Sequence, residues 1–227
     1  MSRYKAVLFD LDGTLAMTME DNFKAWRAAL SEYGINIKPE DYYPLEGLRL
    51  HEIARSFSER YHLKDTDEKE IVKRKEKHYL DNHQFALYPG VEKLITLLRS
   101  RNIPIAMVTA GLTNRLKNSV PLEFLAKFDS IITGDGTDAG KPSPAPYLRA
   151  AEKLGVAPKE CIAVENAPLG IESAKNAGAY CVAICSTLDK SYLEKADEVL
   201  DSFECLQDSE VIRQLLERAG CSERGQE

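Results

Sequence analysis

The sequence has no apolar stretch long enough to cross a membrane. Its 227 residues contain short apolar runs, whereas a membrane-spanning helix needs about 20 consecutive apolar residues. Near the N-terminus, Asp10 and Asp12 interrupt the apolar segment in which the core of a signal peptide would lie. We therefore expect no membrane partner and a cytoplasmic location.

Basic residues are fewer than acidic ones. Lysine and arginine number 30 against 36 acidic residues, giving a formal net charge of -6. Nucleic-acid binding depends on a clustered excess of cations. The one basic run, KRKEKH at 73–78, is interrupted by Glu76 and has the pattern of a solvated helix face. The charge pattern therefore predicts no nucleic-acid partner.

Paired cysteines are missing as well. The five cysteines form no Cys-x-x-Cys pair, and Cys161, Cys181 and Cys185 lie in apolar segments that are typical of buried free thiols. A chain of this length buries about 70% of its unfolded surface, so it needs no disulfide to fold. These cysteines favour a reducing compartment. The four histidines likewise show no metal-binding spacing.

Short apolar runs alternate with longer helical stretches along most of the chain. This alternation predicts an α/β fold, a Rossmann-like three-layer sandwich with a parallel sheet. Proline and glycine punctuate the candidate helices at 90–101, 144–155 and 168–178. The predicted strands are 6–9, 103–109, 130–133, 161–164 and 180–184.

Residues 17–86 break the alternation. Phe23, Trp26, Leu30 and Tyr33 recur at steps of three and four residues, which predicts an amphipathic helix with a buried face. The rest of the segment is helical in periodicity and has no strand-like run. We therefore expect an α-helical cap domain at 17–86, inserted into a core domain made of 1–16 and 87–227.

Polar residues follow the predicted strands at their carboxyl ends, the edge where open parallel sheets bind ligands. Clustered acids repel one another unless a cation compensates them. Oxygen ligands of this kind suit magnesium, with a substrate phosphate completing the charge balance. These residues are Asp10, Asp12, Thr109, Ala110, Gly111, Lys141, Glu165 and Asn166.

Four segments in order, FDLDGTL, VTAG, GKPSP and VENAPLGIESAKNAGA, resemble the haloacid dehalogenase superfamily of aspartate-nucleophile phosphatases. The resemblance covers nearly the whole chain and is strongest to the subgroup containing β-phosphoglucomutase and phosphoglycolate phosphatase. It implies that Asp10 is the nucleophile and forms an aspartyl phosphate. Asp12 would be the general acid for the leaving group and then the base that activates water.

The resemblance also implies how the phosphoryl group is held. Thr109 would bind a phosphoryl oxygen through its hydroxyl, together with backbone N–H groups around Ala110 and Gly111. Lys141 would neutralise charge on the nucleophile and the phosphoryl group. Phosphoryl transfer depends mainly on positioning and electrostatics, so this set of residues is sufficient.

The implied magnesium site consists of Asp10, the backbone carbonyl of Asp12, and Glu165, with Asn166 beside it. Asn166 departs from the family pattern, in which an aspartate commonly follows the residue matching Glu165. The neutral amide brings one negative charge fewer. We expect weaker metal affinity, with activity retained at millimolar magnesium.

A second departure lies in the cap. Mutases of the subgroup have a histidine and a basic residue where this sequence has Asn22 and Glu46. Their absence favours hydrolysis over phosphosugar mutation, which remains the alternative. Asn22, Arg49 and Lys75 are candidate substrate contacts from the cap, although such residues taken alone are more often solvated.

The expected substrate is a small phosphomonoester of the sugar-phosphate or phosphoglycolate type, because the core sets the reaction and the cap sets the leaving group. A phospho-signalling receiver and a phosphate-binding protein without turnover remain alternatives from other classes. The sequence leaves the oligomeric state open.

Overall fold

A six-stranded parallel sheet forms the centre of the molecule. The structure is a computed structural model that describes residues 3–63 and 68–222. Within these residues the strand order is β3-β2-β1-β4-β5-β6, with β1 in the middle and every neighbouring pair parallel. The strands are β1 Ala6–Phe9, β2 Ile105–Val108, β3 Ser130–Ile132, β4 Cys161–Glu165, β5 Tyr180–Ile184 and β6 Glu198–Leu200.

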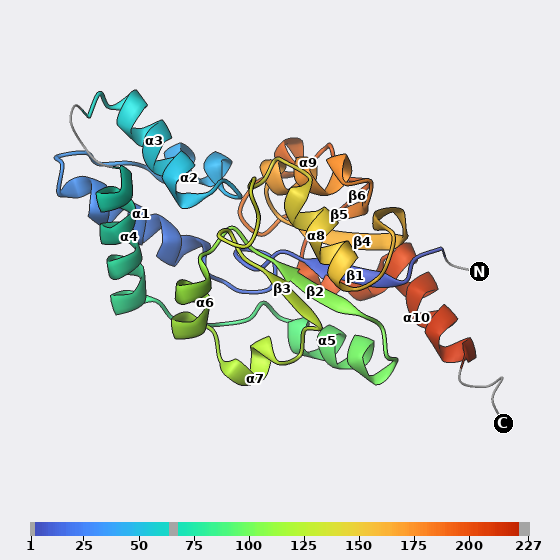
Figure 1. Cartoon of the computed structure of the whole chain (residues 1–227). Coiled ribbons are helices and arrows are strands. Elements are labelled where there is room, and N and C mark those ends of the chain that lie inside the picture. Colours follow the sequence, from blue (N-terminus) through green and yellow to red (C-terminus); the bar gives the residue numbers. More distant parts are fainter. Residues whose placement is uncertain (1–2, 64–67, 223–227) are drawn as a thin grey trace.

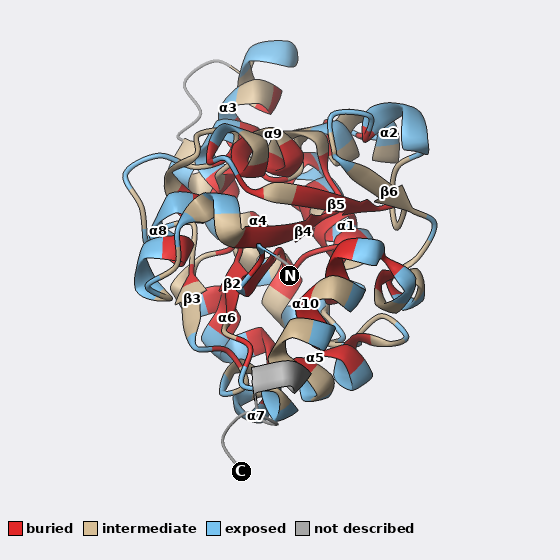
Figure 2. Cartoon of the chain, turned by 90° about the vertical axis from the view of Figure 1, so that its right-hand side faces the viewer, coloured by how far each residue is buried: buried red, intermediate tan, exposed pale blue. Residues whose placement is uncertain are grey.

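Helices cover both faces of this sheet (Figure 1). Successive strand side chains point to opposite faces, so Val7 and Phe9 pack on one side and Ala6 and Leu8 on the other. Buried strands lie between more exposed helices in Figure 2. The structure therefore confirms the predicted three-layer α/β fold. The helices after the cap are α5 Val91–Ser100, α6 Thr113–Ser119, α7 Leu122–Leu125, α8 Ala145–Lys153, α9 Pro168–Asn176 and α10 Glu210–Ser222.

The segment between β1 and α5 is helical and has its own hydrophobic core. Trp26, Tyr42 and Phe57 are almost fully buried there, and the ring centroids of Trp26 and Phe57 are 5.8 Å apart. Figure 1 shows these helices at one end of the molecule, beside the sheet. The domain boundaries at 16/17 and 86/87 stay a prediction. The cap helices are α1 Met19–Ser31, α2 Pro39–Tyr42, α3 Leu50–Arg60 and α4 Glu68–Asn82.

The sequence analysis did not predict the sixth strand, β6. β6 has three residues, all partly exposed, and lies at the edge of the sheet beside β5. So short an edge strand lacks the continuous apolar run of the buried strands, which is the signal that periodicity detects.

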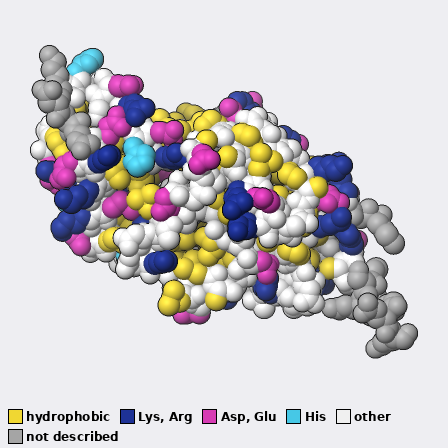
Figure 3. All heavy atoms as spheres, viewed as in Figure 1, with side chains coloured by type: hydrophobic (Ala, Val, Ile, Leu, Met, Phe, Trp, Pro, Cys, Tyr) yellow, Lys and Arg dark blue, Asp and Glu magenta, His cyan; other side chains and the backbone are white. Residues whose placement is uncertain are grey.

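The molecular surface bears charges of both signs. On the face shown in Figure 3, Lys and Arg side chains are interspersed with Asp and Glu. In the part of the chain that the structure describes, we find no helix with the length and apolar character needed to cross a membrane.

Candidate active site

The two aspartates of the DLDGT segment lie at the carboxyl edge of the central strand. The backbone N–H of Asp10 donates to the carbonyl of Val164 at 3.0 Å, which extends the pairing of β1 with β4 by one residue. The chain then turns at Gly13, whose φ of +85° favours glycine. Asp10 and Asp12 are only 6% and 5% exposed. The turn thus places two carboxylates in one buried site.

Asp10 belongs to a buried group that we call the Lys141 cluster: Asp10, Lys141, Tyr147 and Glu165. The ammonium of Lys141 lies 2.6 Å from Asp10 Oδ1 and 2.6 Å from Glu165 Oε1. The Tyr147 hydroxyl donates to the same Glu165 oxygen at 2.6 Å. Gly170 leaves room for this carboxylate, because a Cβ there would lie 2.0 Å from Glu165 Oε1. Every member of the cluster belongs to the core sheet or its adjoining segments.

The Lys141 cluster has more negative than positive charge. Two carboxylates share one ammonium, and all three groups are buried. Burial raises the pKa of Asp10 well above its usual range, and the charge of Glu165 adds to the rise that Lys141 opposes. Burial alone would lower the pKa of Lys141, but Asp10 and Glu165 outweigh it and the net direction is upward. Lys141 therefore stays an ammonium, and the site would gain from a further cation.

Asp12 is surrounded by hydrogen-bond donors. Its Oδ1 accepts from the Thr18 hydroxyl at 2.7 Å and from the Asn22 amide at 3.2 Å. Its Oδ2 accepts from the Arg115 guanidinium at 2.7 Å and from the Thr109 hydroxyl at 3.2 Å. Burial alone would raise the pKa of Asp12, but Arg115 and the hydrogen bonds outweigh it and lower that pKa. In this arrangement Asp12 is a carboxylate.

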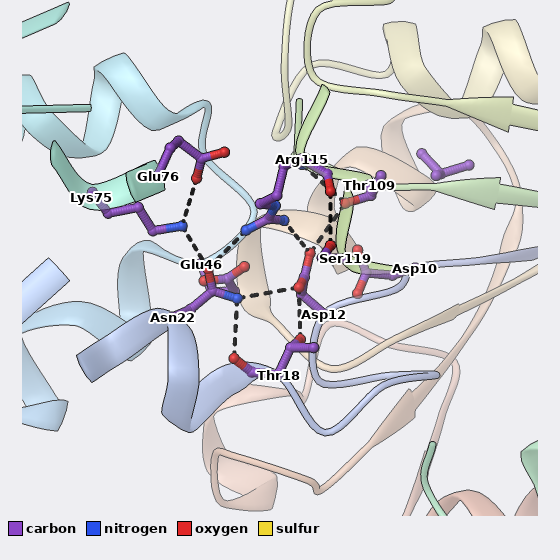
Figure 4. Close-up of polar contacts among 12 residues, drawn as sticks. Asp10, Asp12, Thr18, Asn22, Glu46, Lys75, Glu76, Thr109, Arg115 and Ser119 are labelled. Atoms are coloured by element: carbon purple, nitrogen blue, oxygen red, sulfur yellow. Dashed lines mark hydrogen bonds and ion pairs between the residues drawn. The ribbon is translucent and has the colours of Figure 1, made fainter. Parts of the chain in front are cut away.

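A second charged group joins the cap to the core; we call Asp12, Asn22, Lys75, Glu76 and Arg115 the Arg115 cluster (Figure 4). The Asn22 side-chain oxygen accepts from Arg115 at 2.8 Å and from Lys75 at 2.7 Å. Lys75 also pairs with Glu76 at 3.0 Å. Asn22, Lys75 and Glu76 come from the cap helices α1 and α4, whereas Arg115 comes from α6 of the core.

The prediction of a solvated basic face at 73–78 is wrong for Lys75. Its side chain is fully buried, and its ammonium lies 4.9 Å from the centre of the Tyr79 ring. Burial, and then the charge of Arg115, lower the pKa of Lys75 to about 8. Asn22 is buried too, at 1% exposure. The helical run gave no sign of this burial, because α4 turns Lys75 towards α1 while neighbouring lysines face outward.

The remaining predicted substrate-binding residues are Gly111, Arg49 and Ala110. The Gly111 N–H donates to the Thr109 hydroxyl at 2.9 Å, so that backbone group already has an intramolecular partner. A side chain at Gly111 would collide with Arg115, since an added Cβ would lie 2.3 Å from its guanidinium. Arg49 donates to the backbone carbonyl of Thr137 at 2.7 Å and thereby links the cap to the core. Ala110 lies between Thr109 and Gly111, in the same loop after β2.

Asn166 lies beside the turn that contains Gly13. Its side-chain oxygen accepts from Thr14 at 3.2 Å, and its amide nitrogen donates to Thr187 at 2.9 Å. The structure thus places the Asn166 amide oxygen and the carboxylates of Asp10 and Glu165 at the carboxyl ends of the neighbouring strands β1 and β4. Among the described residues, no three His, Cys, Asp or Glu side chains are gathered as a preformed metal centre. Lys141 separates the two acids, and the third side chain is a neutral amide.

Sequence reasoning missed several polar residues of the site. Arg115 lies in the first turn of α6, with nothing in its neighbourhood to distinguish it from a surface arginine. Thr18 precedes the first cap helix, and Tyr147 resembles an apolar residue of α8. Arg115 and Tyr147 have partners distant in sequence, because Asp12 precedes Arg115 by 103 positions and Glu165 follows Tyr147 by 18.

Comparisons with known proteins identify the family to which the chain belongs. The chain matches the model of the haloacid dehalogenase-like hydrolase family over residues 7–184. It therefore belongs to that enzyme family, which confirms the resemblance read from its sequence. It is 30% identical over 216 residues to hexitol phosphatase A of Escherichia coli (strain K12), covering 89% of this chain and 93% of that protein.

Two further similarities concern β-phosphoglucomutase. The enzyme of Bacillus subtilis (strain 168) is 30% identical over 190 residues, covering 79% of this chain and 83% of that protein. The crystal structure of β-phosphoglucomutase from Clostridium difficile has a TM-score of 0.80 and 26% identity, and it covers 96% of this chain and 99% of that one. The similarity thus includes the helical cap as well as the core.

Proposed function

We propose that the protein is a magnesium-dependent phosphatase that hydrolyses a small phosphomonoester through an aspartyl phosphate. The main support is the contrast between two buried carboxylates at one strand edge. Asp10 faces the Lys141 ammonium at 2.6 Å, while Asp12 is held by Arg115 at 2.7 Å. A nucleophile and a proton carrier need such different environments. Membership of a hydrolase family favours turnover over a signalling receiver or a passive phosphate binder.

In the first step, a carboxylate oxygen of Asp10 attacks phosphorus as the bond to the leaving oxygen breaks. Asp12 gives that oxygen a proton, which it must acquire beforehand by loosening its contacts with Arg115 and Thr18. In the second step, Asp12 as carboxylate takes a proton from water, and the resulting hydroxide attacks phosphorus and frees Asp10. The lowered pKa of Asp12 keeps it ionised, which is the protonation state from which the second step starts. Lys141 balances the charge that moves between Asp10 and the phosphoryl group.

Magnesium suits the donors at this edge, which are oxygen atoms only. Asp10, the backbone carbonyl of Asp12, and Glu165 with the neighbouring Asn166 amide would hold it. The excess negative charge of the Lys141 cluster supports such a site, because a cation would bring the raised pKa of Asp10 back towards its usual range. The ion would supply charge neutralisation for the phosphoryl group when bound.

The test is phosphate release from a panel of small phosphomonoesters, with magnesium and with EDTA. We expect release with millimolar magnesium, and loss of at least about 10³-fold on removing the metal or in Asp10→Asn. Asp189→Asn, a change of the same kind at an exposed site, should keep full activity. Metal-independent release, or unchanged release in Asp10→Asn, would contradict the proposal.

A phosphosugar mutase is the second candidate, and its support is the similarity to two β-phosphoglucomutases over most of the chain. In a mutase the aspartyl phosphate returns its phosphoryl group to a sugar instead of water. Glu46 in place of a basic residue argues against binding a sugar bisphosphate. Conversion of β-glucose 1-phosphate to glucose 6-phosphate in the presence of the bisphosphate, without phosphate release, would establish the mutase.

A further inference from the structure

Glu46 contributes a third acid to the space between cap and core. It follows the short helical turn Tyr43–Leu45, and its carboxylate accepts a hydrogen bond from the Tyr42 hydroxyl. The next residue, Gly47, lies against the core, where an added Cβ would be 3.5 Å from the Gly170 nitrogen and 3.6 Å from the Lys141 side chain. Glu46 is thereby fixed at the point where the cap meets the catalytic edge of the sheet.

Figure 4 shows the Glu46 carboxylate beside Asn22 and Arg115, on the cap side of Asp12. Asp10 lies beyond Asp12 on the core side. A phosphoryl group on Asp10 would therefore have its leaving group near Asp12, with Glu46 among the nearest cap side chains. Burial, and then the charge of Asp12, raise the pKa of Glu46 to about 6, so most of it is a carboxylate at neutral pH.

The cations of the Arg115 cluster already have acidic partners. Arg115 pairs with Asp12 at 2.7 Å, and Lys75 pairs with Glu76 at 3.0 Å. Among the described residues, Glu46 has no such cationic partner. Arg49, a further cap cation, is directed at the Thr137 carbonyl of the core. A second anionic group on the substrate would therefore meet Glu46 and Asp12 rather than an unpaired cation of the cluster, and like charges in a desolvated site repel strongly.

Hydroxyl groups meet no such penalty. A hydroxyl can donate to the Glu46 carboxylate and brings no charge of its own. We propose that the leaving group is a neutral polyhydroxy compound, a polyol or a sugar without a carboxylate or a second phosphate, and that Glu46 accepts a hydrogen bond from one of its hydroxyls. This inference rests on the proposed phosphatase function and narrows its substrate class.

The test compares kcat/KM of the full-length protein, with magnesium, for two groups of substrates. Glycerol 3-phosphate, sorbitol 6-phosphate and glucose 6-phosphate have neutral leaving groups. Phosphoglycolate, 3-phosphoglycerate and fructose 1,6-bisphosphate have anionic ones. We expect the best neutral substrate to exceed the best anionic substrate at least about tenfold, since opposing a like charge costs more than 1.4 kcal/mol.

Substitutions at Glu46 separate a specificity role from a structural one. Glu46→Gln keeps a hydrogen-bond acceptor for Tyr42 and should shrink the preference, while Glu46→Lys should reverse it. Glu59→Lys makes the same charge change at an exposed site of α3 and should leave the ratio unchanged. Circular dichroism and thermal unfolding show whether each variant is folded, and the wild-type ratio tests the inference without any variant.

The outcomes distinguish this inference from the function on which it rests. Release from phosphoglycolate or the bisphosphate in preference to the polyol phosphates would overturn the substrate class and leave the phosphatase standing. Equal shifts in Glu46→Lys and Glu59→Lys would show that Glu46 acts only through overall charge. Absence of release from every substrate would overturn the phosphatase and this inference with it.

Discussion

The two buried charge clusters of the site differ in what holds them together. The Lys141 cluster comes entirely from segments that adjoin the core sheet, and its 2.6 Å contacts join Lys141, in the loop between β3 and α8, to Asp10 and Glu165 at the carboxyl ends of the paired strands β1 and β4. The Arg115 cluster joins cap helices α1 and α4 to α6 of the core, and Asn22 is the shared partner of both its cations. The first cluster can form without the cap, whereas the second requires the cap to lie on the core.

We infer from this difference that the Lys141 cluster serves the reaction, whereas the Arg115 cluster bears on the choice of substrate. In the proposed phosphatase, the sheet edge would position the nucleophile Asp10 and the Lys141 ammonium with little freedom to move, as phosphoryl transfer requires. The groups around the leaving group are assembled from two parts of the chain, so a change in the cap can alter the substrate without disturbing the nucleophile. Substitutions that affect one cluster and spare the other test this separation.

Lys141→Met should have the largest effect, because it removes the only ammonium of the Lys141 cluster. Two carboxylates would then remain buried without a cationic partner, which costs about 3–5 kcal/mol of unfolding free energy. Lys175→Met breaks a more exposed pair with Asp197 and should cost about 1 kcal/mol or less. Urea unfolding at pH 7 measures both. Similar losses in the two variants would mean that the Lys141 cluster adds no particular stability.

Arg115→Met should have an intermediate effect that depends on the leaving group. Arg115 fixes the position of Asp12 through their 2.7 Å contact. In the proposed mechanism an alkyl phosphate needs a correctly placed proton on Asp12, whereas p-nitrophenyl phosphate has a leaving group that departs without one. We expect kcat/KM to fall about 10²-fold for glycerol 3-phosphate and to change little for p-nitrophenyl phosphate.

The matched control for Arg115→Met is Lys117→Met, an exposed cation on the same helix, which should affect neither substrate. kcat/KM is the correct quantity because it includes only steps up to formation of the aspartyl phosphate. An equal fall for both substrates would assign Arg115 a structural role and would weaken the separation between the clusters.

The smallest expected effect is the contribution of Lys75 to the change of the unfolding free energy with pH. Its pKa of about 8 in the folded protein is below the ordinary value of 10.5, so above pH 8 the unfolded chain binds the proton more strongly. Stability from this residue should rise by about 2 kcal/mol between pH 7.5 and 9.5. Lys75→Met should lack this rise, and urea titrations across that range measure it. Parallel pH profiles for wild type and variant would contradict the burial of an ionisable Lys75.

Sequence periodicity was sufficient for most of the fold. The five predicted strands are all present, although the one expected at 103–109 begins at Ile105. Buried parallel strands are detectable because both of their faces are apolar, as the fully buried β1 and β4 show. The short edge strand Glu198–Leu200 and the brief helices α6 and α7 lack this signal, and tertiary contacts decide their conformation.

For the site, position in the sequence was informative only at the strand ends. Asp10, Thr109, Lys141 and Glu165 could be placed together because parallel strands end at one edge of the sheet. Arg115 could not be placed, since its role arises from contact with Asp12 across 103 residues. The burial of Lys75 could not be predicted for the same reason. Whether a helical lysine is solvated or buried depends on which helix packs beside it.

The sequence by itself determined the alternation of strands and helices, the inserted helical segment and the order of polar residues at the strand ends. These follow from local patterns of apolar and polar residues, which persist whatever the rest of the chain does. Only the tertiary structure decided which cation neutralises which acid, and that Glu46 lies beside Arg115 and Asn22. Electrostatic interactions depend on distance through space and on burial, and neither is written in the local sequence.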